Sequence, residues 1–185
     1  DRLLPSSIKF FSKALRNAGR VNSALEYGAN IGVNLLAQRV LYPNQTQFGV
    51  EINQNAAAIL KENIGRENVF SGSIHDFQVT TRFDLVFTKG FLIHVTPDVL
   101  SDVYKKIYDA SLKFILVAEY YNPLPVSIEY RGNKNKLFKR DFAGDLLDQY
   151  TDLSLVDYGF FYRRDPVFPQ DDLTWFLIKK TNTAP

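Results

Sequence analysis

The sequence predicts a doubly wound α/β fold, in which helices cover both faces of a mostly parallel sheet. Three observations predict it. Strand-like apolar runs alternate with amphipathic helical runs, a glycine-containing turn follows the first strand, and the strand Phe83–Thr88 is almost wholly apolar. The 185 residues, 45% of them hydrophobic, suit one substantial core. We therefore expect residues 1–185 to form a single domain.

Spacing and end signals predict the individual elements. The predicted helices are residues 8–18, Asn34–Leu41, a helix capped by Asn53 and stopped at Gly65, a helix that starts at Thr96-Pro97-Asp98 and reaches Leu112, and residues 141–150. The predicted strands are Val21–Tyr27, Gln47–Ile52, Val69–Phe70, Phe83–Thr88, Phe114–Glu119, Leu155–Tyr162 and Thr174–Ile178. We expect the last two strands to pair antiparallel across a long loop, with Trp175 in the core.

Composition excludes several classes of function. A formal charge of +2 is close to neutral, which argues against a nucleic-acid or anionic-membrane partner. No apolar run approaches the roughly 20 residues of a membrane-spanning helix, and no secretion signal is visible, so we expect a cytoplasmic protein. The absence of cysteine excludes disulfides and thiolate zinc sites. Two histidines, His75 and His94, are too few for a histidine-rich metal cage, so no metal is expected.

The turn Glu26-Tyr27-Gly28-Ala29-Asn30-Ile31-Gly32 is the strongest local signal for a ligand site. Gly28 and Gly32 let the chain turn sharply and leave bare backbone for a ligand. Asn30 stands where a glycine is often found, and asparagine tolerates positive φ better than most residues. The acid Glu26 suits an ammonium group, while the helix N-terminus behind the turn suits a carboxylate. An amino-acid zwitterion satisfies both.

Polar and apolar residues at the next two strand ends suit a nucleoside. Glu51 can accept hydrogen bonds from both ribose hydroxyls. Ile52 and Ile74 can sandwich an adenine ring, and Ser73 or Asp76 can meet its polar edge. S-adenosylmethionine consists of an amino acid joined to a nucleoside, so the pattern favours a methyltransferase.

Two other interpretations of the turn are weaker. A nicotinamide or flavin enzyme would need G-x-G-x-x-G, whereas the chain has G-x-N-x-G, and a diphosphate would sit poorly beside Glu26. The glycines can also serve only to make a tight turn. Acids and a serine at three successive strand ends argue against that simpler interpretation.

Residues after the fourth strand are expected near the reacting methyl group. His94 is the natural general base, because its ordinary pKa lies near 6.5. The alternative is a histidine that caps or packs against the helix starting at Thr96. Lys89 and Gly90 are expected to contact the cofactor, although Lys89 can equally be a solvated surface lysine.

The end of the fifth strand provides further candidates for catalysis and acceptor binding. Glu119 and Tyr120 are predicted to be catalytic, and Tyr121 and Asn122 to bind the acceptor. The alternative for the two tyrosines is a core position, and we expect it for one of them. Glu119 follows a mostly apolar strand and needs a polar partner.

A basic cluster gives a possible anion site. It comprises Arg131, Lys134, Lys136, Lys139 and Arg140. Arg131, Lys139 and Arg140 are predicted to hold a phosphate or carboxylate of the acceptor, and a solvated loop is the equal alternative. The same cluster, with Tyr130 and Phe138 nearby, gives some basis for RNA as the acceptor.

Five stretches of the chain resemble the pseudaminic acid biosynthesis-associated methylases, a bacterial group of class I methyltransferases. They are LEYGANIGVN (25–34), FTKGFLIHV (87–95), AEYYNPLPVSIEYRG (118–132), LFKRDFAGDLLD (137–148) and FPQDDLTWFL (168–177). The resemblance implies a Rossmann-like seven-stranded sheet with an antiparallel closing strand and S-adenosylmethionine as cofactor. It also implies a sugar or nucleotide-sugar acceptor of nonulosonic acid type. Family members carry an additional N-terminal segment before Leu3, so we expect a cap segment upstream of residue 1.

Three functional hypotheses follow. The first is a methyltransferase acting on a small molecule at a sugar nitrogen or oxygen. The second keeps the reaction and makes RNA the acceptor. The third is a non-catalytic protein that binds S-adenosylmethionine as a structural or sensing ligand.

Overall fold

The computed structural model describes the backbone of residues 3–130 and 133–181, and the side chains of these except 129–130 and 133–136. The strands are β1 (Ser23–Tyr27), β2 (Thr46–Glu51), β3 (Val69–Ser71), β4 (Phe83–Lys89), β5 (Ser111–Glu119), β6 (Val126–Tyr130), β7 (Asn133–Lys139), β8 (Leu153–Phe161) and β9 (Leu173–Lys180). The helices are α1 (Leu3–Ala14), α2 (Val33–Leu41), α3 (Gln54–Ile64), α4 (Leu100–Ala110) and α5 (Phe142–Gln149), with 3-10 turns η1 (Arg66–Asn68) and η2 (Leu92–His94).

Seven strands form one sheet in the order β3-β2-β1-β4-β5-β9-β8. The five strands from β1 to β5 run parallel, while β9 lies antiparallel to both β5 and β8. The predicted doubly wound sheet and its antiparallel closing pair are therefore confirmed. Because parallel strands end at one edge, the turns after β1, β2, β3 and β4 meet there, which is where ligands bind in such sheets.

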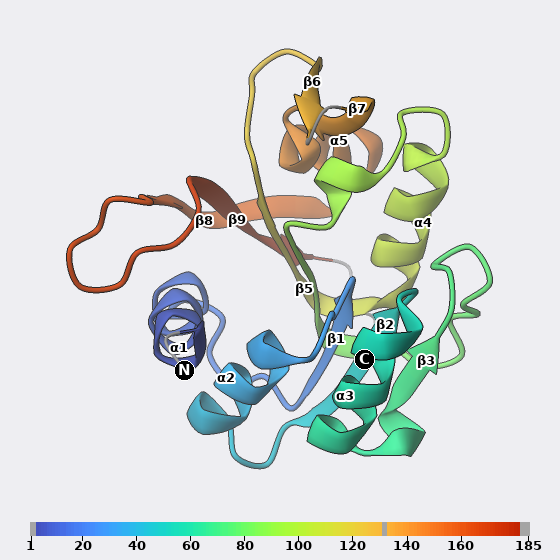
Figure 1. Ribbon diagram of the computed structural model, residues 1–185, viewed down its shortest axis with the longest axis vertical. Coiled ribbons are helices and arrows are strands. Elements are labelled where there is room, and N and C mark those ends of the chain that lie inside the picture. Colours follow the sequence, from blue (N-terminus) through green and yellow to red (C-terminus); the bar gives the residue numbers. More distant parts are fainter. Residues whose placement is uncertain (1–2, 131–132, 182–185) are drawn as a thin grey trace.

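The helices form two layers on opposite faces of the sheet (Figure 1). Helices α1, α2 and α3 pack on one face, whose core includes Phe10, Leu35, Leu60 and Trp175. Helices α4 and α5 cover the other face. The predicted core position of Trp175 is confirmed, since its side chain is fully buried.

Two helix starts follow directly from capping residues. The Asn53 side-chain oxygen accepts hydrogen bonds from Asn55 N at 3.0 Å and Ala56 N at 3.2 Å, as the sequence predicts. Helix α5 is capped in the same way by Asp141, whose Oδ1 accepts from Gly144 N at 2.8 Å. Each cap satisfies backbone donors that a helix start leaves without an intrahelical partner.

The predicted start of α4 at Thr96 is wrong, because the helix begins at Leu100. The Thr96 hydroxyl donates to the Asp98 carboxylate instead of capping, and Val99 N donates to Thr96 O at 3.2 Å. The predicted end at Leu112 is also wrong. Helix α4 ends at Ala110, because β5 begins at Ser111.

Helix α1 begins and ends earlier than the predicted residues 8–18. It starts at Leu3 with Pro5 in its first turn, where the missing proline N–H costs no hydrogen bond. After Ala14 the chain continues in turns rather than in helix, and Gly19 adopts a left-handed φ of 66°.

The antiparallel hairpin formed by β6 and β7 was not predicted. Figure 1 shows it at the top of the molecule, beyond the end of β5 and beside α5. Strand β7 also contacts the η2 turn, and its Leu137 is buried there. The hairpin therefore carries an apolar side chain back to the edge where the strand ends meet.

Candidate functional site

A cleft of about 660 Å³ lies at the carboxyl ends of β1, β2, β3 and β4. Its lining residues are Gly28, Asn30, Val50, Glu51, Ile52, Asn53, Ala56, Gly72, Ser73, Ile74, His75, Gly90, Phe91, His94, Val95, Thr96 and Val99. We call it the first cleft. The sequence-predicted residues Gly28, Asn30, Glu51, Ile52, Ser73, Ile74 and Gly90 lie together here.

The turn after β1 has the backbone conformation that its residue types predict. Gly28 and Gly32 have φ values of 74° and 86°, and Asn30 has a φ of 48°. A Cβ at Gly28 would lie 2.6 Å from Cδ2 of Phe91, which also lines the first cleft. Gly28 is thus required both by its left-handed backbone and by the close approach of Phe91.

Glu51 is fixed at the end of β2 by two backbone donors. Its Oε2 accepts from Asn30 N at 2.8 Å, and its Oε1 accepts from Asn53 N at 2.7 Å. The side chain is 8% exposed and lines the first cleft. Each carboxylate oxygen retains a lone pair that can accept a ligand hydroxyl.

Glu26 is fully buried beneath the turn and does not line the cleft surface. Its Oε1 accepts from Asn34 Nδ2 at 2.6 Å, whereas its Oε2 has no hydrogen-bond partner within the described part of the chain. Burial raises the pKa of Glu26 to about 8, although Asn34 and Lys89 oppose the shift. A buried carboxyl oxygen without a donor is costly, and a cationic ligand group would relieve that cost.

The part of the first cleft that is lined by Ile52, Ile74 and Ser73 combines apolar and polar side chains. Ile52 is 66% exposed and Ile74 is buried, and both line the cleft. The Ser73 hydroxyl accepts from His75 N at 3.2 Å and so is held in place. Asp76, which the sequence offers beside Ser73 as a partner for the polar edge of adenine, is not among the lining residues.

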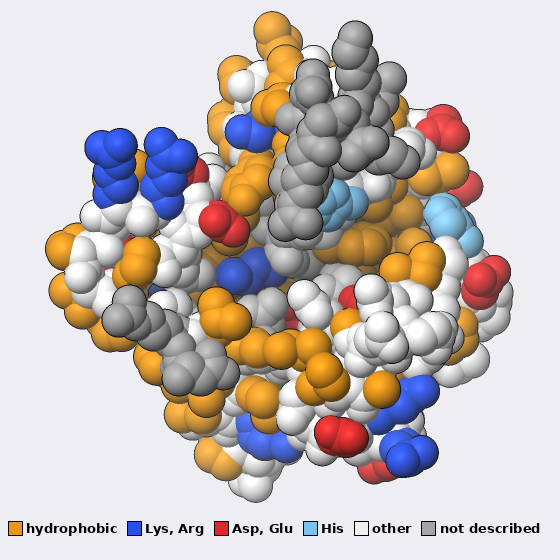
Figure 2. All heavy atoms as spheres, viewed as in Figure 1, with side chains coloured by type: hydrophobic (Ala, Val, Ile, Leu, Met, Phe, Trp, Pro, Cys, Tyr) orange, Lys and Arg blue, Asp and Glu red, His pale blue; other side chains and the backbone are white. Residues whose placement is uncertain are grey.

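A second cleft of about 240 Å³ adjoins the first at Gly90 and His94, which line both. Its other lining residues are Lys89, Ile93, Tyr120, Leu137, Asp171 and Leu173. Figure 2 shows the face hollowed in this region, with a basic side chain inside the hollow. His94 is therefore at the boundary between the two clefts.

Lys89 lies on the second cleft rather than on the first, where the sequence places the cofactor. Its side chain is half-buried, and its Nζ lies 5.4 Å from the ring centroid of Phe10. Desolvation lowers the pKa of Lys89, while Glu26 and Asp171 oppose the shift. Lys89 is thus not the solvated surface lysine that was the alternative interpretation.

Glu119 lies beneath η2 and is 2% exposed. Its Oε1 accepts from Phe91 N and Leu92 N, both at 3.1 Å, and its Oε2 accepts from Ile93 N at 3.4 Å. Burial raises the pKa of Glu119 to about 7, and these backbone donors oppose the shift. The sequence predicts a polar partner for Glu119, and the structure provides it as the backbone N–H groups just before His94.

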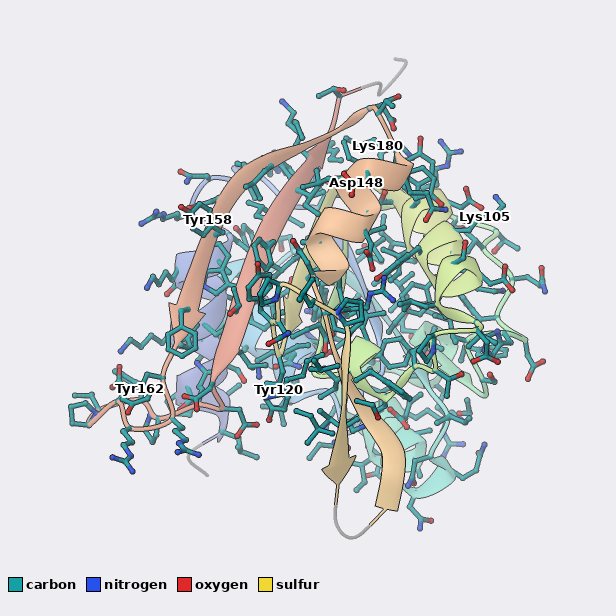
Figure 3. All side chains as sticks on the ribbon, turned by 90° about the horizontal axis from the view of Figure 1, so that it is seen from above. Lys105, Tyr120, Asp148, Tyr158, Tyr162 and Lys180 are labelled. Carbon is teal, nitrogen blue, oxygen red and sulfur yellow. The ribbon has the colours of Figure 1, made fainter. Side chains whose placement is uncertain are left out.

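The remaining residues predicted to contact the acceptor differ in whether they line a cleft. Tyr120 lines the second cleft, and Lys139 Nζ lies 5.1 Å from its ring centroid. Tyr121 is 41% exposed beside Phe176, and Asn122 donates to Leu124 O at 2.6 Å. Neither of these two residues lines either cleft. Figure 3 shows Tyr120 nearer the centre of the molecule than Tyr158 and Tyr162 of the β8 region.

The basic cluster is only partly described. Arg140 pairs with Asp145, with 2.7 Å between Nε and Oδ2, and lines a separate hollow. Arg131 lies outside the described residues, as do the side chains of Lys134 and Lys136. Of the described members, Lys139 alone is near the second cleft, through its contact with Tyr120.

Sequence reasoning missed several lining residues, notably Phe91, Leu137 and Leu173. Phe91 carried a usable signal, since it directly follows the glycine after β4. Leu173 follows the long loop before β9, and Leu137 comes from the unpredicted hairpin. No local pattern connects those positions to the end of β4.

The described residues hold neither a metal-ligand cluster nor a membrane-spanning helix. Within residues 3–130 and 133–181, no group of three or more potential ligands is placed to hold a metal ion. In the same part of the chain, no helix has the length and apolar character needed to span a membrane.

No protein-family model matches the sequence, and no curated protein matches it significantly. Solved structures do match. A 1,6-didemethyltoxoflavin-N1-methyltransferase from Burkholderia thailandensis, bound to 1,6-didemethyltoxoflavin and S-adenosylhomocysteine, has a TM-score of 0.73 and 16% identity, covering 98% of this chain and 79% of that one.

Two further structures are similar. An S-adenosylmethionine-dependent methyltransferase from Clostridium acetobutylicum has a TM-score of 0.69 and 9% identity, over 95% of this chain and 91% of that one. An O-methyltransferase from a polyketide synthase of Brevibacillus brevis, in complex with S-adenosyl-L-homocysteine, has a TM-score of 0.68 and 14% identity, over 98% and 73%. At these identities the likeness shows the fold, which is that of the class I methyltransferases.

Proposed function

We propose that this protein is an S-adenosylmethionine-dependent methyltransferase that acts on a small molecule. The observation that carries the proposal is the fixed carboxylate of Glu51, held by two backbone donors beside the glycine turn in the first cleft. A carboxylate at this strand end suits the two hydroxyls of a ribose. The fold of the similar structures supports the same conclusion.

The described residues fit the other parts of this cofactor. The uncompensated Oε2 of Glu26 suits the ammonium of the methionine portion. Ile52 and Ile74 suit the two faces of adenine, with Ser73 at its edge. The cofactor supplies an electrophilic methyl group, and the protein's task is alignment, which alone can contribute about 7–11 kcal/mol to lowering a barrier.

The second cleft is the proposed acceptor site, because it adjoins the first at His94 and Gly90. We propose that His94 contacts the acceptor and takes its proton where the nucleophile must lose one, an effect typically worth about 10²–10⁴-fold. Glu119 is a positioning residue in this proposal. Its carboxylate holds the backbone of η2 and so the place of His94.

For the acceptor we propose a sugar or nucleotide sugar of nonulosonic acid type, and membership of the pseudaminic acid-associated methylases. This finer proposal is supported by the five resembling stretches rather than by the similar structures. The described acceptor wall adds His94, Tyr120 and Asp171, which are side chains able to bind hydroxyl groups. The hollow is also small, at about 240 Å³, which favours a compact acceptor group.

The direct test is isothermal titration of the protein with S-adenosylhomocysteine. We expect a single site with a stoichiometry near one and a rise in melting temperature, since a ligand that binds only the native state stabilises it. Adenosine alone should bind more weakly, because it lacks the group proposed for Glu26. Absence of both heat and thermal shift would contradict the proposed function. A thermal shift without methyl transfer to any of a panel of nucleotide sugars would favour the non-catalytic alternative.

A further inference from the structure

The second cleft contains an oppositely charged pair of side chains that do not bind each other. Lys89 and Asp171 both line it, and both also line a neighbouring hollow of about 340 Å³ between α1 and the loop before β9. They are close enough for Asp171 to influence the pKa of Lys89. Yet the ion pairs found among the described residues do not include this one. The two side chains therefore line the same cleft without forming an ion pair with each other.

Among the described residues, the ammonium of Lys89 has no direct hydrogen-bond acceptor. Within the described part of the chain, its recorded contact is with the Phe10 ring, at 5.4 Å, and it makes no hydrogen bond. The side chain is half-buried, so water compensates it only in part. An ammonium has three donors, and in such surroundings a carboxylate is its strongest available partner.

The carboxylate of Asp171 is similarly without a donor among the described residues, although its backbone is well held. Asp171 O accepts from Leu173 N at 2.6 Å, and the adjacent Gln170 Nε2 donates to Ser6 O at 2.9 Å. Because the loop is tied to α1 at this point, the backbone of Asp171 has a defined place at the cleft wall. It offers an acceptor to an amine or a hydroxyl group.

The rest of the wall supports a polar ligand that reaches both charges. His94 and Tyr120 bring a ring nitrogen and a phenol to the same small hollow. Ile93 and Leu137 form its apolar part. Asp171 is exposed to solvent, so an acceptor that covers both Lys89 and Asp171 but pairs with only one would strip water from the other and lose binding free energy.

We propose that the second cleft recognises an acceptor carrying both a carboxylate, bound by Lys89, and an amine or hydroxyl donor, bound by Asp171. This inference rests on the proposed function, since it names the class of acceptor for that same site. The shared chemistry occurs in sugar acids and in amino acids, so both sources are included in the test.

The experiment uses the full chain with S-adenosylhomocysteine added, and measures binding of three compounds by NMR titration. D-glucuronate carries the carboxylate and hydroxyls, D-glucosaminate carries a carboxylate and an amine, and D-glucuronamide is the uncharged counterpart of the first. We expect glucuronate to bind about tenfold or more tightly than glucuronamide, as a charge-assisted hydrogen bond predicts. Glucosaminate should also bind more tightly than glucuronamide if its amine donates a hydrogen bond to Asp171.

Variants separate the two halves of the proposal. Lys89→Met should reduce the glucuronate preference to about onefold, since the charge that creates it is gone. Asp171→Asn should keep the preference for glucuronate over glucuronamide. It should weaken the binding of both compounds, because the carboxylate proposed to accept from a ligand hydroxyl is lost. Lys105→Met is the matched control. That lysine is exposed on α4, lines neither cleft, and pairs with Asp109.

The outcomes are distinct. Equal binding of glucuronate and glucuronamide, or no binding of any compound up to its solubility limit, overturns the inference. A preference for glucuronate over glucuronamide that persists in Lys89→Met also overturns the inference. If Asp171→Asn strengthens glucuronate and leaves glucuronamide unchanged, Asp171 only repels anions and the donor half is wrong. Titration of S-adenosylhomocysteine on the same samples separates failure of this inference from failure of the proposed function.

Discussion

The two clefts at the edge of the sheet are built in different ways. Much of the first cleft comes from successive turns of one stretch of chain, between Gly28 and His75, and backbone conformation shapes much of it. The second cleft gathers side chains from β4, η2, the end of β5, the β6–β7 hairpin and the loop before β9. The first cleft is lined mainly by consecutive turns of one part of the chain, whereas the second brings together residues that are far apart in the sequence.

This difference affects what substitutions should do. In the first cleft, a change alters backbone geometry or a carboxylate fixed by backbone donors, so stability and ligand binding should fall together. In the second cleft, side chains such as Asp171 are exposed and make few internal bonds, so changes should alter specificity more than stability. Predictions for the first cleft are therefore the most direct test of the contrast.

The largest effect is expected for Gly28→Ala. The new Cβ would meet Phe91 at 2.6 Å, and φ is 74°. Left-handed backbone costs about 1–2 kcal/mol for a non-glycine residue, and overpacking adds about 1–3 kcal/mol. We expect the free energy of unfolding in urea to fall by about 2–5 kcal/mol on this basis, with S-adenosylhomocysteine affinity reduced at the same time.

Gly19→Ala is the matched control for that variant. Its φ is 66°, and an added Cβ would meet nothing within 4 Å. It should cost only the backbone contribution, about 1–2 kcal/mol, and leave the ligand affinity unchanged. If the two variants lose equal stability and both keep full affinity, the close approach of Phe91 has no role in the cleft.

A smaller effect is expected for Glu51→Gln. The amide keeps one acceptor but turns an NH₂ toward either Asn30 N or Asn53 N, which are both donors. We expect S-adenosylhomocysteine to bind about 10–100-fold more weakly, the range for losing a hydrogen bond to a charged group. Glu62→Gln, an exposed carboxylate on α3, is the control.

The same variant identifies which ligand atoms Glu51 meets. The native protein should prefer adenosine over 2′,3′-dideoxyadenosine, and Glu51→Gln should lose that preference while binding the dideoxy compound almost unchanged. A preference that persists in the variant would assign the ribose hydroxyls to another residue.

The sequence predicted the first cleft well because its signals are local. A left-handed Asn30 between two glycines, a capping Asn53 and an acid at the end of a strand each depend on residues within a few positions. The sheet followed from the same alternation of apolar runs. The alternation also located the closing pair β8 and β9, which needed no knowledge of tertiary contacts.

The lining of the second cleft was predicted only in part, because it depends on contacts between residues that are far apart in the sequence. Tyr121 and Asn122 were expected to bind the acceptor, but β5 ends at Glu119 and they lie outside both clefts. The hairpin that supplies Leu137 was missed, since Pro123 and Pro125 and the following charged residues read as a loop. Thr96 looked like a helix cap because the sequence does not show that Glu119 holds the preceding turn.

The last prediction is a pH dependence due to Glu26. Burial raises its pKa from 4.5 to about 8, so between these values the folded protein holds a proton that the unfolded chain releases. Stability should therefore fall as pH rises through this window, by up to about 1.4 kcal/mol per pH unit, with no contribution below pH 4.5 or further loss above pH 8. Glu26→Gln should flatten the dependence, as measured by urea unfolding at several pH values.

Two comparisons make that result specific. Glu119, with its pKa raised to about 7, contributes its own slope in both proteins, so the difference between native protein and Glu26→Gln isolates Glu26. Glu67→Gln, an exposed carboxyl on η1, should leave the dependence unchanged.

Saturating S-adenosylhomocysteine should reduce the native slope, because an ammonium beside Glu26 favours its ionised form and lowers its pKa. An unchanged slope with ligand bound would mean that the ammonium lies elsewhere, and the assignment of Glu26 to the amino-acid end of the cofactor would be lost.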